Sequence, residues 1–238
     1  LAPQLASAIP QAQLPASGDT AGARLNASPR HTEWVEIESR GDVIDAFVAY
    51  PERADNAPVV VVIHEIYGLT DWARAVADQL AAEGFIAIVP VMLSGKGPNQ
   101  AGSTGLDSQA AVSLMRTLQP NEVTRRINMA VEYATSLPSA TGHFGVIGFC
   151  WGGSTTFNYA TTREDLGAAV GYYGGAPEAF ALRRAEAPIM GVYGGEDQRV
   201  NATIDGAKAE MDRRGKRYEP FIYGGAGHGF LRAQEGQD

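Results

Sequence analysis

Residues 59–63 form an uninterrupted run of β-branched side chains, Val-Val-Val-Val-Ile, between Pro58 and His64. The run is too short for a typical helix, and it lacks the alternation of apolar and polar residues that marks a strand with one face in water. Such runs are typical of strands in parallel sheets, which are buried on both faces because helices cover both sides. This segment therefore predicts a parallel sheet between two layers of helices.

Segments of strand and helix character alternate along the rest of the chain. Apolar residues at alternate positions on either side of Arg40 and Gly41 predict a β-hairpin over residues 32–50. Helices are expected over residues 71–83, 108–118, 122–137 and 202–214 and from Trp151 onward, and strands over residues 85–90, 143–147, 167–172, 188–193 and 217–223. This alternation predicts an α/β fold with a mainly parallel sheet and helices on both faces.

The length and the N-terminal composition suggest one domain preceded by an arm. The 238 residues fit a single core, which we place at residues 32–238. Residues 1–31 are rich in Ala, Pro, Ser and Gln and have no stable hydrophobic period, so we expect an extended N-terminal arm. Such an arm fits a protein exported after removal of a signal as well as a cytoplasmic one, and both locations stay open.

The charge pattern argues against several kinds of partner. The net charge is −8, and the only basic cluster is the short stretch at residues 213–217, which disfavours binding to nucleic acid or to anionic membranes. The longest apolar run, residues 85–93, is far shorter than the roughly 20 residues needed to span a bilayer. The sequence therefore favours a small-molecule partner and predicts no membrane span. It leaves open whether the protein is a monomer or a small homo-oligomer.

The only cysteine, Cys150, lies in the segment Gly-Phe-Cys-Trp-Gly-Gly between a predicted strand and a predicted helix. This is a cysteine form of the nucleophile elbow, a tight turn that carries the nucleophile of α/β-hydrolases. The turn needs small residues on both sides, and Gly148 and Gly152 meet that need. A thiol at a helix N-terminus is favoured as the thiolate, its reactive form. The motif alone also fits an ordinary buried thiol beside closely packed glycines.

Two later motifs supply the partners that a nucleophile requires, in the chain order of α/β-hydrolases, acid before base. Glu196 and Asp197 follow the strand predicted at residues 188–193, and we choose Asp197 as the acid, with Glu196 as its competitor. His228 lies on a glycine-rich loop after the last strand, which suits a mobile general base better than a core residue. His64 is expected to have a structural role, although it lies close enough to help shape the site.

The loop after the first buried strand, with the sequence His-Glu-Ile-Tyr-Gly, is expected to complete an oxyanion hole. One backbone amide of such a site comes from the residue after the nucleophile, here Trp151, and the other from this loop, here Ile66. Glu65 is unusual, because its carboxylate is expected to point toward the nucleophile. The alternative for Glu65 is a structural salt bridge.

These four motifs, in this order, resemble the dienelactone hydrolase family, also called carboxymethylenebutenolidases, over roughly residues 32–232. The resemblance implies an α/β-hydrolase fold with Cys150 as nucleophile, a triad completed by Asp197 and His228, and Glu65 in contact with the resting thiol. It implies no metal and no organic cofactor.

The resemblance also implies an arginine for the substrate carboxylate, which corresponds here to Arg232. A second arginine of the family has no counterpart, and an aspartate after Pro90 is replaced by Val91. Lys96 lies nearby and could substitute for the second arginine as a point charge, although it cannot provide the bidentate fork of an arginine. We therefore take Arg232, Lys96 and Tyr67 as the candidate substrate-binding residues.

The sequence thus predicts a hydrolase of small esters or enol-lactones, including carboxylate-bearing ones, that acts through a thioester on Cys150. Two alternatives stay open. One is a broad carboxylesterase of small esters without preference for lactones. The other is a binding module with a dormant site, although the complete set of Cys150, Asp197, His228 and Glu65 argues against it.

Overall fold

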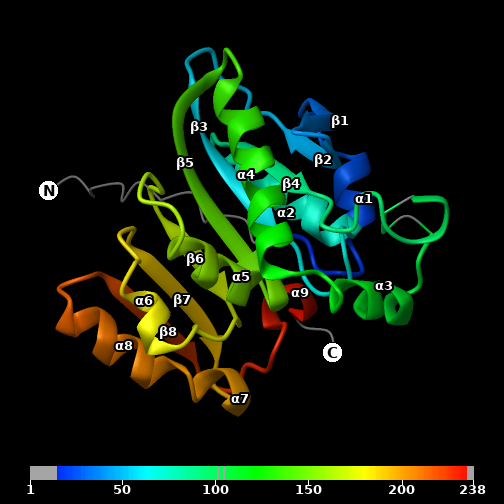
Figure 1. Cartoon of the computed structure of the whole chain (residues 1–238). Coiled ribbons are helices and arrows are strands. Elements are labelled where there is room, and N and C mark those ends of the chain that lie inside the picture. Colours follow the sequence, from blue (N-terminus) through cyan, green and yellow to red (C-terminus); the bar gives the residue numbers. More distant parts are fainter. Residues whose placement is uncertain (1–14, 101, 104, 235–238) are drawn as a thin grey trace, which may run out of the picture.

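The β-branched run at residues 59–63 becomes strand β3 (Ala57–Ile63), which lies in the middle of an eight-stranded sheet (Figure 1). The structure, a computed structural model, describes residues 15–100, 102–103 and 105–234. Val59, Val61 and Ile63 pack into one apolar core, and Val60 and Val62 pack into another on the opposite face. The expected burial of this strand on both faces is confirmed.

The sheet is mixed but mainly parallel. Its strand order is β1-β2-β4-β3-β5-β6-β7-β8. The strands besides β3 are β1 (Thr32–Ser39), β2 (Asp42–Ala49), β4 (Ile86–Pro90), β5 (Ala140–Phe149), β6 (Ala169–Tyr172), β7 (Ile189–Gly194) and β8 (Tyr218–Tyr223). The hairpin of β1 and β2 is antiparallel, as is the pair β2 and β4, and the other neighbours are parallel. The carboxyl ends of β3 to β8 therefore meet at one edge of the sheet.

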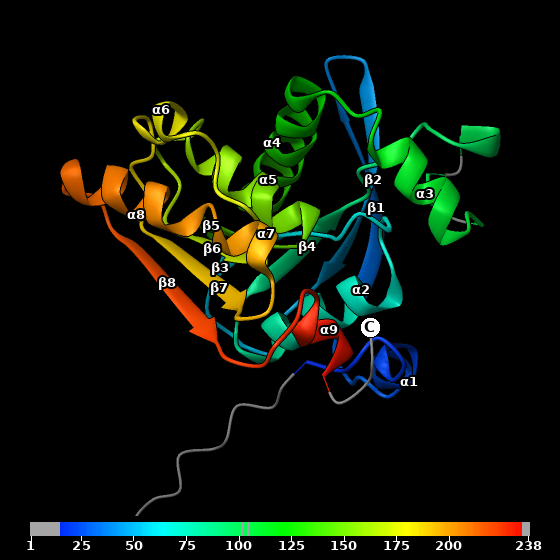
Figure 2. The ribbon, with the colours of Figure 1, turned by 90° about the horizontal axis from the view of Figure 1, so that it is seen from below.

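Helices cover both faces of this sheet (Figure 2). One core contains side chains of α4 (Pro120–Ser136), α5 (Trp151–Ala160) and α8 (Ile204–Arg213), and the other contains side chains of α2 (Asp71–Ala82) and α1 (Ala21–Asn26). Shorter helices are η1 (Pro98–Gln100), α3 (Ser108–Met115), α6 (Ala179–Leu182), α7 (Gln198–Asn201) and α9 (Phe230–Ala233). The predicted fold class, a mainly parallel sheet between two helical layers, is confirmed.

The structure differs from the expected extended arm before residue 32. Residues 15–31 include helix α1, and this segment packs against α2 because its small side chains, Ala16 and Ala21, are buried there. Residues 1–14 of that arm lie outside the described residues. Within the described parts of the chain, no helix is long and apolar enough to cross a membrane.

Candidate active site

The turn between β5 and α5 holds Cys150 in a strained backbone conformation, with φ 56° and ψ −114°. A Cβ atom on Gly148 would lie 2.1 Å from the carbonyl oxygen of Gly152, and one on Gly152 would lie 2.1 Å from that of Ile63. Neither contact can be relieved by rotating a side chain, because the opposing atoms are backbone. The glycines expected from the sequence are therefore required by the close approach of α5 to β5 and β3.

Three strand ends bring together a relay of cysteine, histidine and aspartate. The Nε2 atom of His228 lies 3.1 Å from the Sγ atom of Cys150, and its Nδ1 atom lies 2.5 Å from Oδ2 of Asp197. Asp197 follows β7 and is buried, whereas its competitor Glu196 is exposed. His228 follows β8, between that strand and α9. The structure thus joins the three residues that the sequence separated by up to 78 positions.

The electrostatic environment favours the charged form of His228. Its pKa is raised to about 9, mainly by the hydrogen bond with Cys150 and further by the hydrogen bond with Asp197, while burial opposes the shift. At neutral pH the imidazolium can donate from Nδ1 to the carboxylate and from Nε2 to the sulfur.

Glu65, the residue after His64 on the loop that follows β3, is buried and forms an ion pair with Arg232, whose Nε atom lies 2.9 Å from Oε2. Burial raises the pKa of Glu65, and the positive charges of Arg232 and His228 oppose that rise. Among the described residues, no hydrogen bond joins Glu65 to Cys150. The salt bridge that we considered as the alternative for Glu65 is thus present. The contact of Glu65 with the resting thiol, which the family resemblance implied, stays a prediction.

His64 links this loop to the segment after β4. It is fully buried, and burial lowers its pKa to about 4, so the ring is neutral at pH 7. A carbonyl only accepts, so Nδ1–H of His64 donates to the carbonyl oxygen of Glu65 over 2.7 Å, and Nε2 accepts the amide of Met92 over 3.3 Å. The structural role expected for His64 is thus a bridge between two loops of the site.

The amide of Trp151, the first residue of α5, is one of the N-terminal amides that have no partner within their own helix. Ile66 lies on the loop that His64 holds, next to Glu65. Of the two expected oxyanion donors, the amide of Trp151 therefore directly follows Cys150, and the amide of Ile66 directly follows Glu65.

A pocket of about 910 Å³ opens beside this relay. It is lined by residues from four separate segments of the chain: Gly18, Asp19, Glu65, Tyr67, Thr70, Asp71, Trp72, Ser108, Gly227, His228 and Arg232. The guanidinium of Arg232 lies over the ring of Tyr67, 5.7 Å from its centre. Arg232 and Tyr67, two of the three candidate substrate-binding residues, are thus in the pocket. A second pocket, of about 380 Å³ between α4 and α5, has no acidic, histidine or cysteine side chain in its lining.

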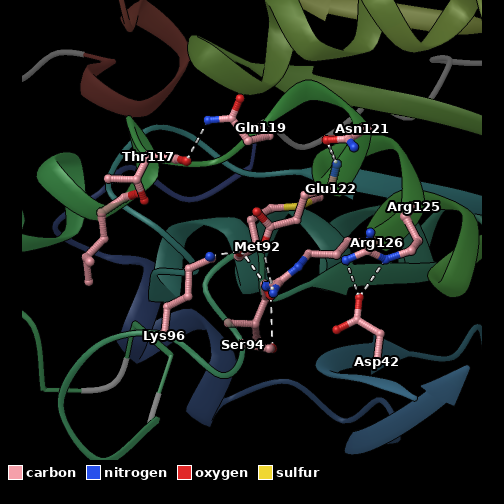
Figure 3. A network of polar contacts seen from close by, with 12 residues as sticks. Asp42, Met92, Ser94, Lys96, Thr117, Gln119, Asn121, Glu122, Arg125 and Arg126 are labelled. Carbon is pink, nitrogen blue, oxygen red and sulfur yellow. Dashed lines mark hydrogen bonds and ion pairs between the residues drawn. The ribbon is translucent and has the colours of Figure 1, made fainter. Parts of the chain in front are cut away.

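Lys96, the third candidate, lies elsewhere (Figure 3). Its Nζ atom is 3.1 Å from Oε1 of Glu122, which also pairs with Arg126 across 3.0 Å. Arg126 is buried and donates to the carbonyl oxygen of Met92. Lys96 therefore ties the loop after β4 to helix α4, and it is absent from the described lining of the pocket.

Two residues of the site were missed in the sequence. Tyr173 follows β6 with φ 39°, is fully buried, and sets its ring edge-on against that of His228, with centroids 5.2 Å apart. Burial raises the pKa of Tyr173, and the charge of Glu65 adds to that rise. Its place after a strand was an available signal, because the carboxyl ends of parallel strands carry sites. The second missed residue, Asp19, also lines the pocket. It belongs to the segment expected to be an extended arm, and no strand is predicted before it in the sequence to indicate a site.

Among the described residues, no group of three or more His, Cys, Asp or Glu side chains could hold a metal ion.

Comparison with known proteins identifies relatives over most of the chain. The sequence profile of the dienelactone hydrolase family matches residues 44–238. Carboxymethylenebutenolidase 1 of Cupriavidus pinatubonensis is 30% identical over 207 residues, which are 85% of this chain and 87% of that protein. A protein of Methylorubrum extorquens, named "Putative carboxymethylenebutenolidase", is 32% identical over 224 residues, 86% of this chain and 76% of that protein.

Solved structures agree with the sequence relatives. The dienelactone hydrolase-like promiscuous phosphotriesterase P91 from metagenomic libraries superposes with a TM-score of 0.74 at 25% identity, covering 84% of each chain. An acylaminoacyl peptidase of Pyrococcus horikoshii, at 17% identity and a TM-score of 0.69, covers 90% of this chain and 41% of its own, and shows the shared fold alone.

Proposed function

Because this chain belongs to the dienelactone hydrolase family, a family of ester hydrolases with the α/β-hydrolase fold, we propose that it cleaves small esters and enol-lactones with Cys150 as the nucleophile. The observation that carries this proposal is the relay from Cys150 through His228 to Asp197, with distances of 3.1 and 2.5 Å. The carboxymethylenebutenolidase relative supports the lactone as one substrate.

In the first half-reaction the thiolate of Cys150 attacks the carbonyl carbon of the substrate. The carbonyl oxygen takes up the negative charge and accepts hydrogen bonds from the amides of Ile66 and Trp151. The tetrahedral intermediate then expels the alkoxide or enolate, which takes the Nε2 proton of His228. The products of this step are an acyl thioester on Cys150 and the free alcohol or enol.

In the second half-reaction His228 acts as a base. Formation of the thioester removes the thiolate, and the hydrogen bond with Cys150 is the largest cause of the raised pKa of His228. The pKa of the imidazole therefore falls in the acyl-enzyme, and its neutral form takes a proton from water. The resulting hydroxide equivalent attacks the thioester, which releases the carboxylic acid and restores the thiolate and imidazolium pair.

A broad carboxylesterase without lactone preference is the second candidate. It is favoured by the ion pairs of Arg232 with Glu65 and of Lys96 with Glu122, because both cations that could receive the carboxylate of a dienelactone already have acidic partners. Kinetics on a neutral enol-lactone, which needs no carboxylate site, and on p-nitrophenyl esters distinguish the two candidates. A kcat/KM at least about tenfold higher for the lactone supports the first.

The role of Cys150 is tested with Cys150→Ala on p-nitrophenyl acetate. We expect kcat/KM to fall by about 10³-fold or more, because alanine has no thiolate with which to form the acyl-enzyme. Mass spectrometry of the quenched wild-type enzyme should find the acetyl group on the peptide that contains Cys150. The exposed Ser113→Ala variant on α3 serves as the control and should keep the wild-type rate.

A Cys150→Ala variant that is folded and as fast as the wild type would contradict the proposed function. If the wild type hydrolyses neither ester nor lactone and Cys150 resists iodoacetamide at neutral pH, the dormant binding module is the better account.

A further inference from the structure

Residues 15–30, which we call the N-terminal strap, lie beside α2 and α9 (Figure 2). Two residues of the strap, Gly18 and Asp19, line the pocket. At the start of the strap, the indole N–H of Trp72 donates to the carbonyl oxygen of Ala16 over 3.0 Å, and this contact is buried. The amide of Gly18 donates to the carbonyl oxygen of Arg232 over 2.9 Å. The strap is thereby attached directly to two segments that line the pocket.

The far end of the strap is held by a buried ion pair. Arg30 binds Asp78 of α2 with two hydrogen bonds of 2.8 and 2.5 Å, and the hydroxyl of Ser28 donates to the same carboxylate. The Asp78 side chain is only 1% exposed, so a loss of Arg30 would leave a buried charge without its partner. Because both ends are fixed, the strap holds residues 18 and 19 at a defined place.

That place is the wall of the pocket next to Arg232. Gly18 lies so near that a Cβ atom on it would be 3.3 Å from Cγ of Arg232. Arg232 therefore has the strap against its aliphatic part, the ring of Tyr67 against its guanidinium, and Glu65 at its Nε atom. Asp19 follows Gly18 in the lining and is exposed.

The charges in the lining disfavour an anionic substrate. Three carboxylates, Asp19, Glu65 and Asp71, line the pocket. The cations of its described lining are Arg232, which pairs with Glu65, and His228, which pairs with Asp197. A substrate carboxylate would meet repulsion from the exposed Asp19 and would have to compete with Glu65 for Arg232. A neutral ester or lactone meets neither cost.

We propose that the N-terminal strap is part of the substrate site and that Asp19 makes the site select neutral esters and lactones over carboxylate-bearing ones. This inference rests on the proposed function, because it concerns the substrate of the same relay. It also concerns a segment that precedes the match to the family profile, which begins at residue 44.

The test compares two esters with the same leaving group, p-nitrophenyl butyrate and mono-p-nitrophenyl succinate. For the wild type we expect kcat/KM to be about tenfold higher for the neutral ester. In Asp19→Asn the ratio of kcat/KM, anionic over neutral, should rise about fivefold, the size of a charge interaction across several ångströms of partly screened solvent. The ratio in the wild type should also rise with added salt.

Asp205→Asn is the matched control, because it removes the same charge from an exposed position on α8 without touching the pocket. It should leave the ratio unchanged, and Asp19→Glu, which keeps the charge, should stay close to the wild type. A wild type that prefers the succinate ester, or an Asp19→Asn ratio equal to that of the wild type, would overturn the inference. Failure of the proposed function looks different, because then neither ester is hydrolysed in a way that depends on Cys150.

Discussion

His64 controls the geometry of the loop that carries Ile66, one of the two proposed oxyanion donors. Its Nδ1–H holds the carbonyl oxygen of Glu65, and the peptide bond between Glu65 and Ile66 is planar and trans. The carbonyl and the N–H of that peptide therefore point in opposite directions. By fixing the carbonyl, His64 orients the Ile66 amide, so it is a positioning residue rather than a catalytic one.

We expect His64→Ala to lower kcat by about 100-fold, the cost of misplacing one oxyanion donor, while KM changes much less. His64→Gln should recover a large part of kcat, because a glutamine amide supplies both a donor and an acceptor. Steady-state kinetics on a p-nitrophenyl ester, with near-UV circular dichroism as the check of folding, measure both effects. A glutamine variant as slow as the alanine variant, or an equal loss in both parameters, would refute the positioning role.

The proposed catalytic residues could be identified from their local sequence. Cys150 and His228 lie in glycine-rich turns, and Asp197 lies in the loop after a predicted strand. The partners of long charged side chains could not be predicted from the sequence. Such a side chain reaches several ångströms from its own backbone, so it can contact any of several neighbours. Thus Lys96 pairs with Glu122, and Glu65 pairs with Arg232.

At the scale of the elements, the site depends on the contact of α5 with the ends of β5 and β3. Gly152 lies where the first turn of α5 meets the backbone of Ile63 and His64, and a Cβ atom there would be 2.1 and 2.5 Å from their carbonyl oxygens. The elbow and the loop that carries Glu65 therefore share one tightly packed contact.

Gly152→Ala should lower the free energy of unfolding by about 3 kcal/mol or more, because the new methyl group forces backbone apart in a packed interior. Gly206→Ala is the matched control, since no atom lies within 4 Å of its Cβ position and it lies within helix α8. That change should stabilise the protein by about 0.5–1 kcal/mol through helix propensity. Urea unfolding of both variants provides the comparison, and equal stabilities would contradict the packing argument.

The predicted elements follow the observed ones closely where periodicity is strong. The hairpin, α2 and α4 fall where alternation or helical spacing placed them, and β3 falls where the unbroken run of β-branched residues placed it. The helix α1 was not expected, because its short sequence, Ala-Gly-Ala-Arg-Leu-Asn, has no apolar stripe of its own. It is stabilised by packing on α2, and such tertiary support is not visible in local sequence.

For the whole molecule, two histidines make stability depend on pH on both sides of 6.5. The pKa of His228 is about 9 in the folded state, above its ordinary value of 6.5. The contribution of His228 to the free energy of unfolding is fully present below pH 6.5 and is lost as the pH rises through about 9. The pKa of His64 is about 4, below 6.5. The contribution of His64 to the free energy of unfolding is present above pH 6.5 and is lost as the pH falls through about 4.

The wild type should lose stability between pH 6.5 and 9, and we expect His228→Gln to show a smaller loss over this range. Between pH 6.5 and 4 we expect the free energy of unfolding of His64→Gln to fall by ~3 kcal/mol less than that of the wild type. Urea unfolding of the wild type and both variants across this range measures the differences. Variant curves that run parallel to the wild-type curve at every pH would contradict these assignments.

By itself, the sequence determined the fold class, the order of the strands and of the longer helices from residue 32 onward, and the identity of the relay residues. These features follow from hydrophobic periodicity, from glycine spacing and from the meeting of parallel strand ends at one edge, which are properties of short segments. Only the tertiary structure decided that the N-terminal strap forms a wall of the pocket, that Glu65 pairs with Arg232, and that Lys96 lies apart. Those outcomes depend on which distant surfaces come into contact, and the residues themselves carry no local pattern that specifies the partner.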